Sequence, residues 1–281
     1  MKFGVNLLLF SDTIDAKVIE QFPRIRELGA DGVEVPIFDP GSILVDEIRA
    51  AAERAGLRLT ASGALPPGTR FYEDGEPRGK AERYMRDTVR TAGALGAEVL
   101  CGPFYKAVGE LDDSVPFDEQ RKRTGEALGP LVAEADATGV TIAVETLNRF
   151  ETDLLNTVAD GIALCDAAGG GAGLLLDTFH MNIEEKDSAA AIAAAAGAGR
   201  LAHFHASEND RGVAGTGQVR WDEVADALRQ SGYDRWVVLE SFDQNNQAIR
   251  TAVSCWRPFY SSAEDFVRDG LAFVRERFGR G

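Results

Sequence analysis

Acidic side chains and an imidazole follow four short apolar runs in the second half of the chain. TIAV, GLLL and WVVL each precede a carboxylate, and LAHF precedes a histidine. Carboxylate oxygens and an imidazole nitrogen together suit Mn²⁺, Co²⁺ or Mg²⁺, whereas a structural zinc site would call for thiolates. Burying ionised acids there is costly unless a cation or hydrogen bonds compensate. The pattern predicts one bound divalent metal ion, with the ligands Glu145, Asp177, His205 and Glu240.

Two of the three histidines in the chain lie close together. His203 and His205 are two residues apart in one predicted strand, so both side chains point to the same face of the sheet. The spacing leaves open whether that face is the inside or the outside of the sheet. We assign the metal to His205, which is nearer the end of the strand, and expect His203 to be a hydrogen-bonded buried imidazole.

Strand-like and helix-like segments alternate from one end of the chain to the other, as in parallel sheets with helical crossovers. The predicted strands are 2–10, 31–38, 57–65, 97–105, 140–147, 172–180, 201–208 and 235–242, and the clearest predicted helices are 15–29, 42–56, 80–96, 118–139, 221–232 and 263–278. Eight such units favour a single closed (β/α)8 barrel over residues 1–281. A doubly wound sheet is disfavoured, because no GxGxxG motif follows the first strand. The working residues of such barrels lie at the C-terminal ends of the strands.

Composition excludes several classes of partner. The 45 acidic residues outnumber the 30 basic ones, giving a net charge of -15, so phosphate backbones and anionic membranes are disfavoured partners. We therefore expect no nucleic acid and no membrane contact. Three scattered cysteines, no cleavable leader and no apolar stretch long enough to span a bilayer predict a cytoplasmic protein.

Four motifs also resemble a known family in their order and spacing. They are ETLNRFETDLLNT, LDTFHMNIEE, HFHASENDRGVAGTG and VVLESF. They are similar to those of the ketose 3-epimerases, which include D-tagatose, D-allulose (psicose) and L-ribulose 3-epimerases, within the xylose-isomerase-like TIM barrels. The resemblance implies the same four metal ligands, with Glu145 and Glu240 also forming the acid–base pair. It further implies that Glu151, His180 and Arg211 bind the sugar, that no organic cofactor is needed, and that the protein is a homodimer or homotetramer.

The reaction implied by the resemblance is the inversion of a free ketose at C3. Candidate pairs are D-fructose and D-allulose, D-tagatose and D-sorbose, or L-ribulose and L-xylulose. A proton on a carbon next to a ketone is too weak an acid for a carboxylate unless the enediolate is stabilised. A metal-bound cis-enediolate would meet that need, with one glutamate removing the proton and the other returning it to the far face.

Other readings remain open. An aldose–ketose or hydroxypyruvate-type isomerase could use the same acids, whereas a multi-zinc nuclease is disfavoured by the charge and by the small number of histidines. The insert 247–260 could cap the barrel mouth or form an oligomer interface. Near the ends of the first four strands, Glu34 could contact the sugar or make a buried hydrogen bond. The candidate pocket-lining residues in this half are Asn6, Phe10, Glu34, Ser62, Cys101 and Tyr105.

Overall fold

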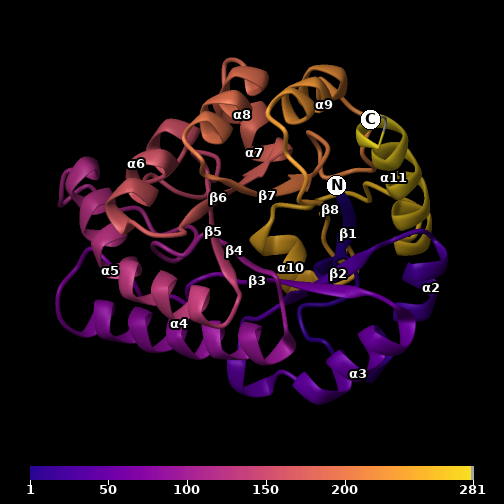
Figure 1. The fold of residues 1–281 in the computed structure, drawn as a ribbon, viewed down its shortest axis with the longest axis horizontal. Coiled ribbons are helices and arrows are strands. Elements are labelled where there is room, and N and C mark those ends of the chain that lie inside the picture. The colour runs from indigo at the N-terminus through magenta and orange to yellow at the C-terminus, as the bar shows by residue number, and fades with distance from the viewer. Residues whose placement is uncertain (280–281) are drawn as a thin grey trace.

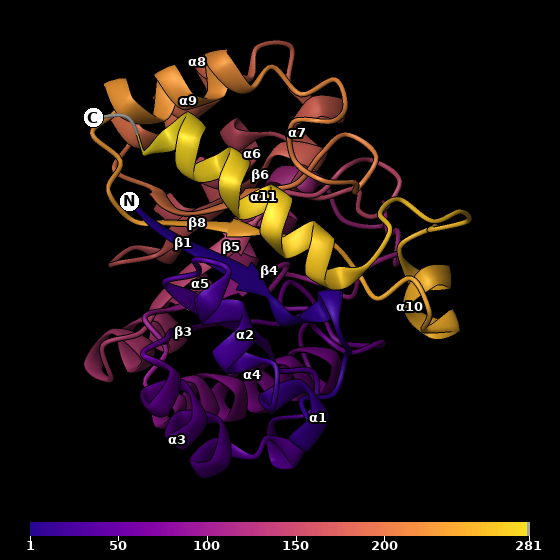
Figure 2. The same ribbon diagram turned by 90° about the vertical axis from the view of Figure 1, so that its right-hand side faces the viewer.

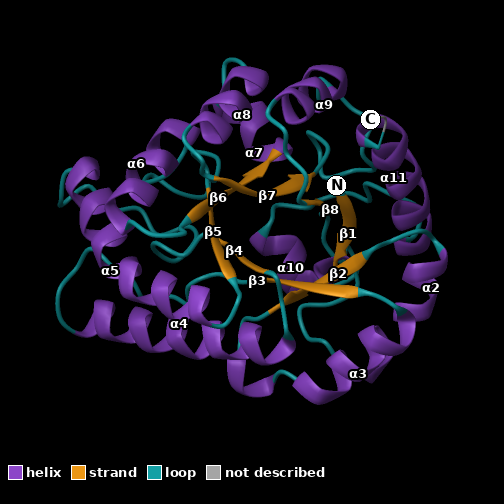
Figure 3. Ribbon diagram, in the orientation of Figure 1, coloured by secondary structure: helices purple, strands orange, loops and turns teal. Residues whose placement is uncertain are grey.

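The computed structural model describes residues 1–279, which form a closed barrel of parallel strands surrounded by helices (Figures 1 and 3). In the described residues the strands are β1 (Lys2–Asn6), β2 (Gly32–Pro36), β3 (Arg58–Ser62), β4 (Val99–Gly102), β5 (Thr141–Glu145), β6 (Gly173–Asp177), β7 (Leu201–Ala206) and β8 (Trp236–Leu239). Each strand pairs with the next, and β8 pairs with β1. The predicted (β/α)8 barrel is therefore confirmed. Residues 280 and 281 of the predicted domain lie outside the described residues.

The helices follow the predicted order, and three predicted segments differ locally, the first being strand 2–10, which ends at Asn6. They are α1 (Ala16–Ile19), α2 (Phe22–Glu27), α3 (Val45–Ala55), α4 (Glu76–Leu95), α5 (Phe117–Ala137), α6 (Val158–Ala168), α7 (Thr178–Glu184), α8 (Ser188–Gly197), α9 (Trp221–Gln230), α10 (Gln247–Ala252) and α11 (Ala263–Phe278), with 3-10 turns η1 (Leu7–Leu9) and η2 (Pro40–Ser42). The predicted helix 15–29 is two helices, with Pro23 in the first turn of α2. The predicted strand 172–180 ends at Asp177, whose carboxylate caps α7. Within residues 1–279, no helix is both long enough and apolar enough to cross a membrane.

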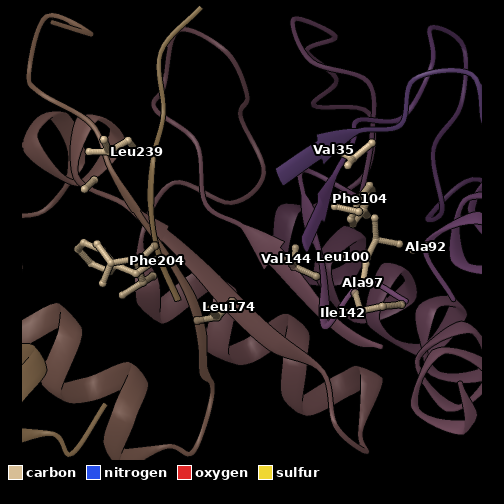
Figure 4. Close-up of a cluster of buried hydrophobic side chains, with 14 of the residues drawn as sticks. Val35, Ala92, Ala97, Leu100, Phe104, Ile142, Val144, Leu174, Phe204 and Leu239 are labelled. Carbon is tan, nitrogen blue, oxygen red and sulfur yellow. The ribbon is translucent and has the colours of Figure 1, made fainter. Parts of the chain in front are cut away.

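Alternation along the strands separates two buried apolar layers. The outward side chains pack against the helices (Figure 4) and include Val35, Leu100, Val144, Leu174, Phe204 and Leu239. The inward ones form a smaller cluster of Val99, Cys101, Ala143, Leu175, Ala202, Trp236 and Val238. Trp236 extends across the start of the barrel to Gly32, where an added Cβ would lie 2.5 Å from the indole. The barrel is thus packed at that end, and its functional site lies at the other.

A bulge between β6 and β7 sets the direction of the two histidines. The pairing runs from Leu174 with Leu201 to Leu175 with His203, so Ala202 is an extra residue in β7. After the bulge, Phe204 packs in the outer layer, and His203 and His205 face the barrel interior, where both contact Glu34. This settles the direction that the spacing alone left open.

The insert after β8 lies over the mouth of the barrel. Figure 1, viewed down the barrel, shows α10 within the ring of strands, and Figure 2 shows it at the end opposite the N-terminus. Ala252 and Val253, at the end of this helix, line the same cavity as Glu145 and Glu240. The insert therefore caps the mouth, one of the two roles that the sequence allowed.

Candidate active site and metal centre

The four predicted metal ligands converge at the mouth. Glu145 and Asp177 end β5 and β6, His205 is the second-last residue of β7, and Glu240 follows β8 directly. All four side chains are buried, and one ligand atom from each lies within 4.8 Å of the others. Donor atoms bound to one ion with bonds of ~2.1 Å lie up to ~4 Å apart, so only small side-chain adjustments would be needed.

The ring nitrogens of His205 indicate that the residues fit a cation. Nε2 lies 2.8 Å from Glu34 Oε1, and an ionised carboxylate can only accept, so Nε2 carries a proton. Nδ1 faces Glu240 Oε1 at 3.2 Å and has no hydrogen-bond partner among the described residues. Burial opposes a charge on His205, but the carboxylates of Glu34 and Glu240 outweigh it and raise its pKa well above the usual value, so positive charge is favoured between Nδ1 and Glu240. A divalent ion could take the place of the Nδ1 proton there.

The carboxylates are held in different electrostatic states. Burial and the neighbouring Glu240 carboxylate raise the pKa of Glu145 well above its usual value. Burial also raises the pKa of Asp177. For Glu240, burial opposes ionisation, but His205 and Arg211 outweigh it and lower the pKa to about 2. In the protein without an ion, Glu240 is thus the ionised member of the pair and Glu145 the one that favours its proton.

Arg211 is the cation that partly balances these acids. Its Nη1 donates to Asp177 Oδ2 at 2.8 Å and to Glu240 Oε2 at 2.9 Å. The guanidinium stacks over the ring of Phe179, 3.8 Å from the centroid. Its backbone has a φ of +66°, a conformation uncommon outside glycine that clusters at functional sites. Asp177 and Glu240 share this one guanidinium and the pKa of Glu145 stays raised beside them, so a divalent ion would be needed for all three acids to ionise together.

His180 and Glu151 complete the polar end of the site. The backbone N–H of Asn148 donates to His180 Nδ1 at 3.0 Å, and His180 Nε2 lies 3.2 Å from Arg211 Nη2, which can only donate. Burial and Arg211 lower the pKa of His180 to about 3, which keeps it neutral. The amide of Asn148 also donates to Glu151 Oε1 at 2.7 Å, and burial raises the pKa of Glu151. The site therefore offers both a donor and an acceptor for hydroxyl groups.

These residues line one cavity of about 250 Å³. Of the predicted site residues, its lining includes Glu145, Glu151, His180, His205, Arg211, Glu240, Ser62 and Cys101, while Asp177 lies behind, bonded to Arg211. The sequence analysis missed the apolar wall formed by Leu8, Phe38, Pro103, Val108, Leu147, Phe242, Ala252 and Val253. Phe242 could have been found, because it lies two residues beyond Glu240. Ala252 and Val253 could not, because their place depends on how α10 packs over the mouth.

Four predicted pocket residues are not among the lining. Asn6 and Glu34 face the barrel interior and hydrogen-bond to each other at 3.0 Å. Glu34 lies two residues before the end of β2, so its side chain sits below the mouth. Two roles were predicted for Glu34, a contact with the sugar and a buried hydrogen bond, and the structure shows the buried hydrogen bond. Tyr105 is buried behind the wall, and Phe10, at the end of η1, packs against the outer layer.

Comparison with known proteins identifies the family. Residues 22–275 match a protein-family model that is described as a xylose isomerase-like TIM barrel. The ketose 3-epimerase of Arthrobacter globiformis is 32% identical, over 99% of this chain and 96% of that protein. The D-psicose 3-epimerase of Agrobacterium fabrum is 31% identical, over 98% of each chain.

A solved structure agrees in fold over almost the whole chain. The crystal structure of a D-allulose 3-epimerase from Methylomonas sp. in complex with D-allulose has a TM-score of 0.91 and 29% identity, covering 99% of this chain and 97% of that one. Similarity that spans both chains from end to end includes the strands that carry the site. The chain therefore belongs to the xylose isomerase-like TIM barrels and, within them, to the ketose 3-epimerases, which are isomerases acting on sugars.

Proposed function

We propose that this protein inverts free ketoses at C3 and depends on one divalent ion, Mn²⁺ or Co²⁺ before Mg²⁺, held by Glu145, Asp177, His205 and Glu240. The observation that carries the proposal is the pair Glu145 and Glu240. Both line the cavity, both belong to the four-residue donor set, and they come from the ends of different strands, β5 and β8. Two carboxyl groups that reach one bound sugar from different strands can act as the base and the acid of a two-base proton transfer.

The reaction moves one proton off C3 and one proton onto it. The ionised glutamate removes the C3 proton, and the electron pair left on carbon is delocalised into the C2 carbonyl as a cis-enediolate. The protonated glutamate then delivers its proton to the opposite face of C3, and the roles exchange in the reverse direction. A divalent ion bound by the four ligands supplies a Lewis acid for the carbonyl oxygen and so lowers the barrier to removing the proton.

The neighbouring side chains orient the sugar. In this proposal His180 and the guanidinium of Arg211 contact oxygens near C1 and C2, and Glu151 accepts a hydrogen bond from a hydroxyl. The apolar lining residues, which include Leu8, Phe242 and Val253, exclude water from the reacting carbons. Among the described lining residues, Arg211 is the one arginine or lysine, and it is already bonded to two acids. This supports an uncharged ketose over a sugar phosphate.

The test is an exchange experiment on the whole protein. Metal-stripped protein is incubated in D₂O with D-fructose, D-tagatose, D-allulose or L-ribulose, with and without Mn²⁺ or Co²⁺, and the products are followed by NMR. We expect the C3 epimer to form only with the ion present, with deuterium confined to C3. The relative rates would rank the substrates.

Other outcomes would reject parts of the proposal. Aldose products with deuterium at C1 or C2 would favour an aldose–ketose isomerase using the same acids. Equal rates after complete chelation would remove the metal from the reaction. Absence of exchange with every free ketose would reject the substrate class.

Assembly and compartment are part of the same proposal. We propose a homodimer or homotetramer, as the family resemblance implies, and light scattering after size-exclusion chromatography measures it directly. The three cysteines are buried free thiols. This supports a reducing compartment such as the cytoplasm.

A further inference from the structure

A buried carboxylate lies one layer below the proposed metal ligands. Glu34, in the middle of β2, is fully buried, and both of its oxygens accept hydrogen bonds. Oε1 accepts from His205 Nε2 at 2.8 Å and Asn6 Nδ2 at 3.0 Å, and Oε2 accepts from His203 Nε2 at 2.7 Å, Thr60 Oγ1 at 3.0 Å and Cys101 Sγ at 3.4 Å. A carboxylate has about four lone-pair sites. Glu34 is therefore saturated by donors.

The same place in the barrel could be read as a second metal site. Glu34, Cys101, His203 and His205 each offer a donor atom within 4.8 Å of the others, and such a mixed set suits zinc. The hydrogen bonds argue against that reading. Both imidazoles meet Glu34 through Nε2 at ordinary N–H···O distances, so both Nε2 atoms carry protons and cannot bind an ion. An ion here would also have to displace the donors from Asn6 and Thr60.

We propose that Glu34 is a positioning residue for His205 and not a ligand. By accepting the Nε2–H it fixes the tautomer and the ring orientation in which Nδ1 points toward Glu145, Asp177 and Glu240. The inference rests on the proposed function, because it assumes that these residues bind an ion. Histidines that bind metals commonly donate their other N–H to a carboxylate, and loss of that partner costs about 10- to 100-fold in metal affinity.

The first experiment measures the affinity for Mn²⁺ alone, from the EPR signal of the free ion, in the metal-stripped protein. Glu34→Gln keeps the shape of the side chain, but its single carbonyl oxygen cannot accept from both imidazoles. We expect the Kd for Mn²⁺ to rise by about 10- to 100-fold. Thr60→Val is the matched control. It removes one buried donor from Oε2 and leaves Oε1 and His205 in contact, so its Kd should stay within about threefold of wild type.

A second measurement uses the wild-type protein, so it does not require that a variant fold correctly. The chain has three histidines, so ring-nitrogen NMR of ¹⁵N-histidine wild-type protein is readily assigned. We expect a proton on Nε2 of both His203 and His205, in the metal-free and in the Mg²⁺-saturated protein. Titration with Co²⁺ should end at one equivalent without a thiolate charge-transfer band.

The outcomes separate this inference from the proposed function. A folded Glu34→Gln protein with wild-type affinity for Mn²⁺ would overturn the positioning role and leave the metal centre intact. A second Co²⁺ equivalent with a thiolate band would make Glu34 and Cys101 ligands and would also overturn it, as would an unprotonated Nε2 on His205. Wild-type protein that binds none of the three ions would reject the metal centre, and this role with it.

Discussion

The two halves of the barrel contribute different things to its mouth. Strands β5 to β8 end in three carboxylates and an imidazole, and these groups line or support the reactive end of the cavity. Strands β1 to β4 contribute smaller or hydrogen-bonding side chains at their inward positions, namely Asn6, Thr60, Ser62 and Cys101. They also contribute one acid, Glu34, which lies deeper in the barrel. In the proposed reaction the second half supplies the reacting groups, and the first half supplies support and space.

The halves also differ in how their buried charges are balanced. In the first half the buried charges of Glu34 and Lys106 each have a partner, which comes from the second half of the chain. Two imidazoles face Glu34, and Lys106, after β4, is paired with Asp153. In the second half Glu145 and Asp177 share Arg211 with Glu240 and keep raised pKa values. Uncompensated charge is typical of functional sites. Changes in the second half should therefore affect the reaction most, and changes in the first half should affect stability.

Glu240→Gln should have the largest effect on activity. The amide cannot take up a proton, so we expect turnover to fall by about 10²- to 10⁴-fold while the fold is retained. Steady-state rates with each epimer, together with circular dichroism, measure this. Glu264→Gln, at an exposed position on α11, is the control and should retain wild-type turnover. A Glu240→Gln protein with near-wild-type kcat would remove Glu240 from the acid–base pair.

The Lys106–Asp153 pair tests the first half. The Lys106 side chain is fully buried, whereas that of Asp153 is 19% exposed. Asp153→Leu leaves an unpaired buried ammonium and should cost about 3–5 kcal/mol in the free energy of unfolding. Lys106→Met should cost less, because the remaining carboxylate reaches solvent and still accepts the N–H of Asp112 at 2.7 Å. Urea unfolding gives these free energies.

The double variant Lys106→Met/Asp153→Leu separates charge from packing. It should recover most of the stability lost in Asp153→Leu, since no buried charge remains unpaired. Arg24→Met, which breaks an exposed pair with Glu264, should leave the free energy of unfolding close to that of the wild type. A double variant no more stable than Asp153→Leu would mean that Asp153 matters through its shape and not its charge.

Adding a divalent ion should reduce the difference in charge balance between the two halves and stabilise the folded protein. At a free Mn²⁺ concentration of 100 times Kd, binding to the folded state alone adds about 2.7 kcal/mol of stability. For a chain of this size that corresponds to a rise in Tm on the order of 5–10 °C. Calorimetry with chelator and with Mn²⁺ measures the shift. Glu240→Gln should show a smaller rise, and an equal rise in both proteins would place the stabilising ion elsewhere.

The sequence predicted the parts of this arrangement that depend on local pattern. Apolar runs ending in an acid are visible along the chain, so the strands and the positions of Glu145, Asp177 and Glu240 at strand ends could be predicted. The parallel topology then brings them together. For Glu34 the sequence indicates only a place near the end of a strand, and its depth below the mouth follows from the register between β2 and β3.

The parts that were missed depend on contacts between distant segments. The bulge at Ala202 exists only in the pairing of β6 with β7, and it decides which face His205 presents. Val253 reaches the cavity because α10 folds back over the mouth. The partner of Lys106 lies in the loop after β5, and no periodicity links the two positions. Tertiary packing, and not local propensity, determines each of these.

Asp112 offers the smallest test, because it has the same low pKa as Glu240 for a different reason. Hydrogen bonds from Ser114 and from the Tyr72 hydroxyl lower the pKa of Asp112 to about 2, from 3.8. A carboxyl whose folded pKa is depressed contributes stability above its unfolded pKa, and that contribution is lost as the pH falls from about 3.8 to about 2.

Asp112→Asn should therefore be less stable than wild type at pH 7, by less than about 1 kcal/mol for a group near the surface. The difference between the two proteins should shrink below pH 4, over the range in which both stay folded. Urea midpoints at pH 7, 5, 4 and 3 measure it. A difference that stays constant with pH would mean that the Asp112 charge is not what holds this loop, and that the first half of the mouth relies on packing where we infer paired charges.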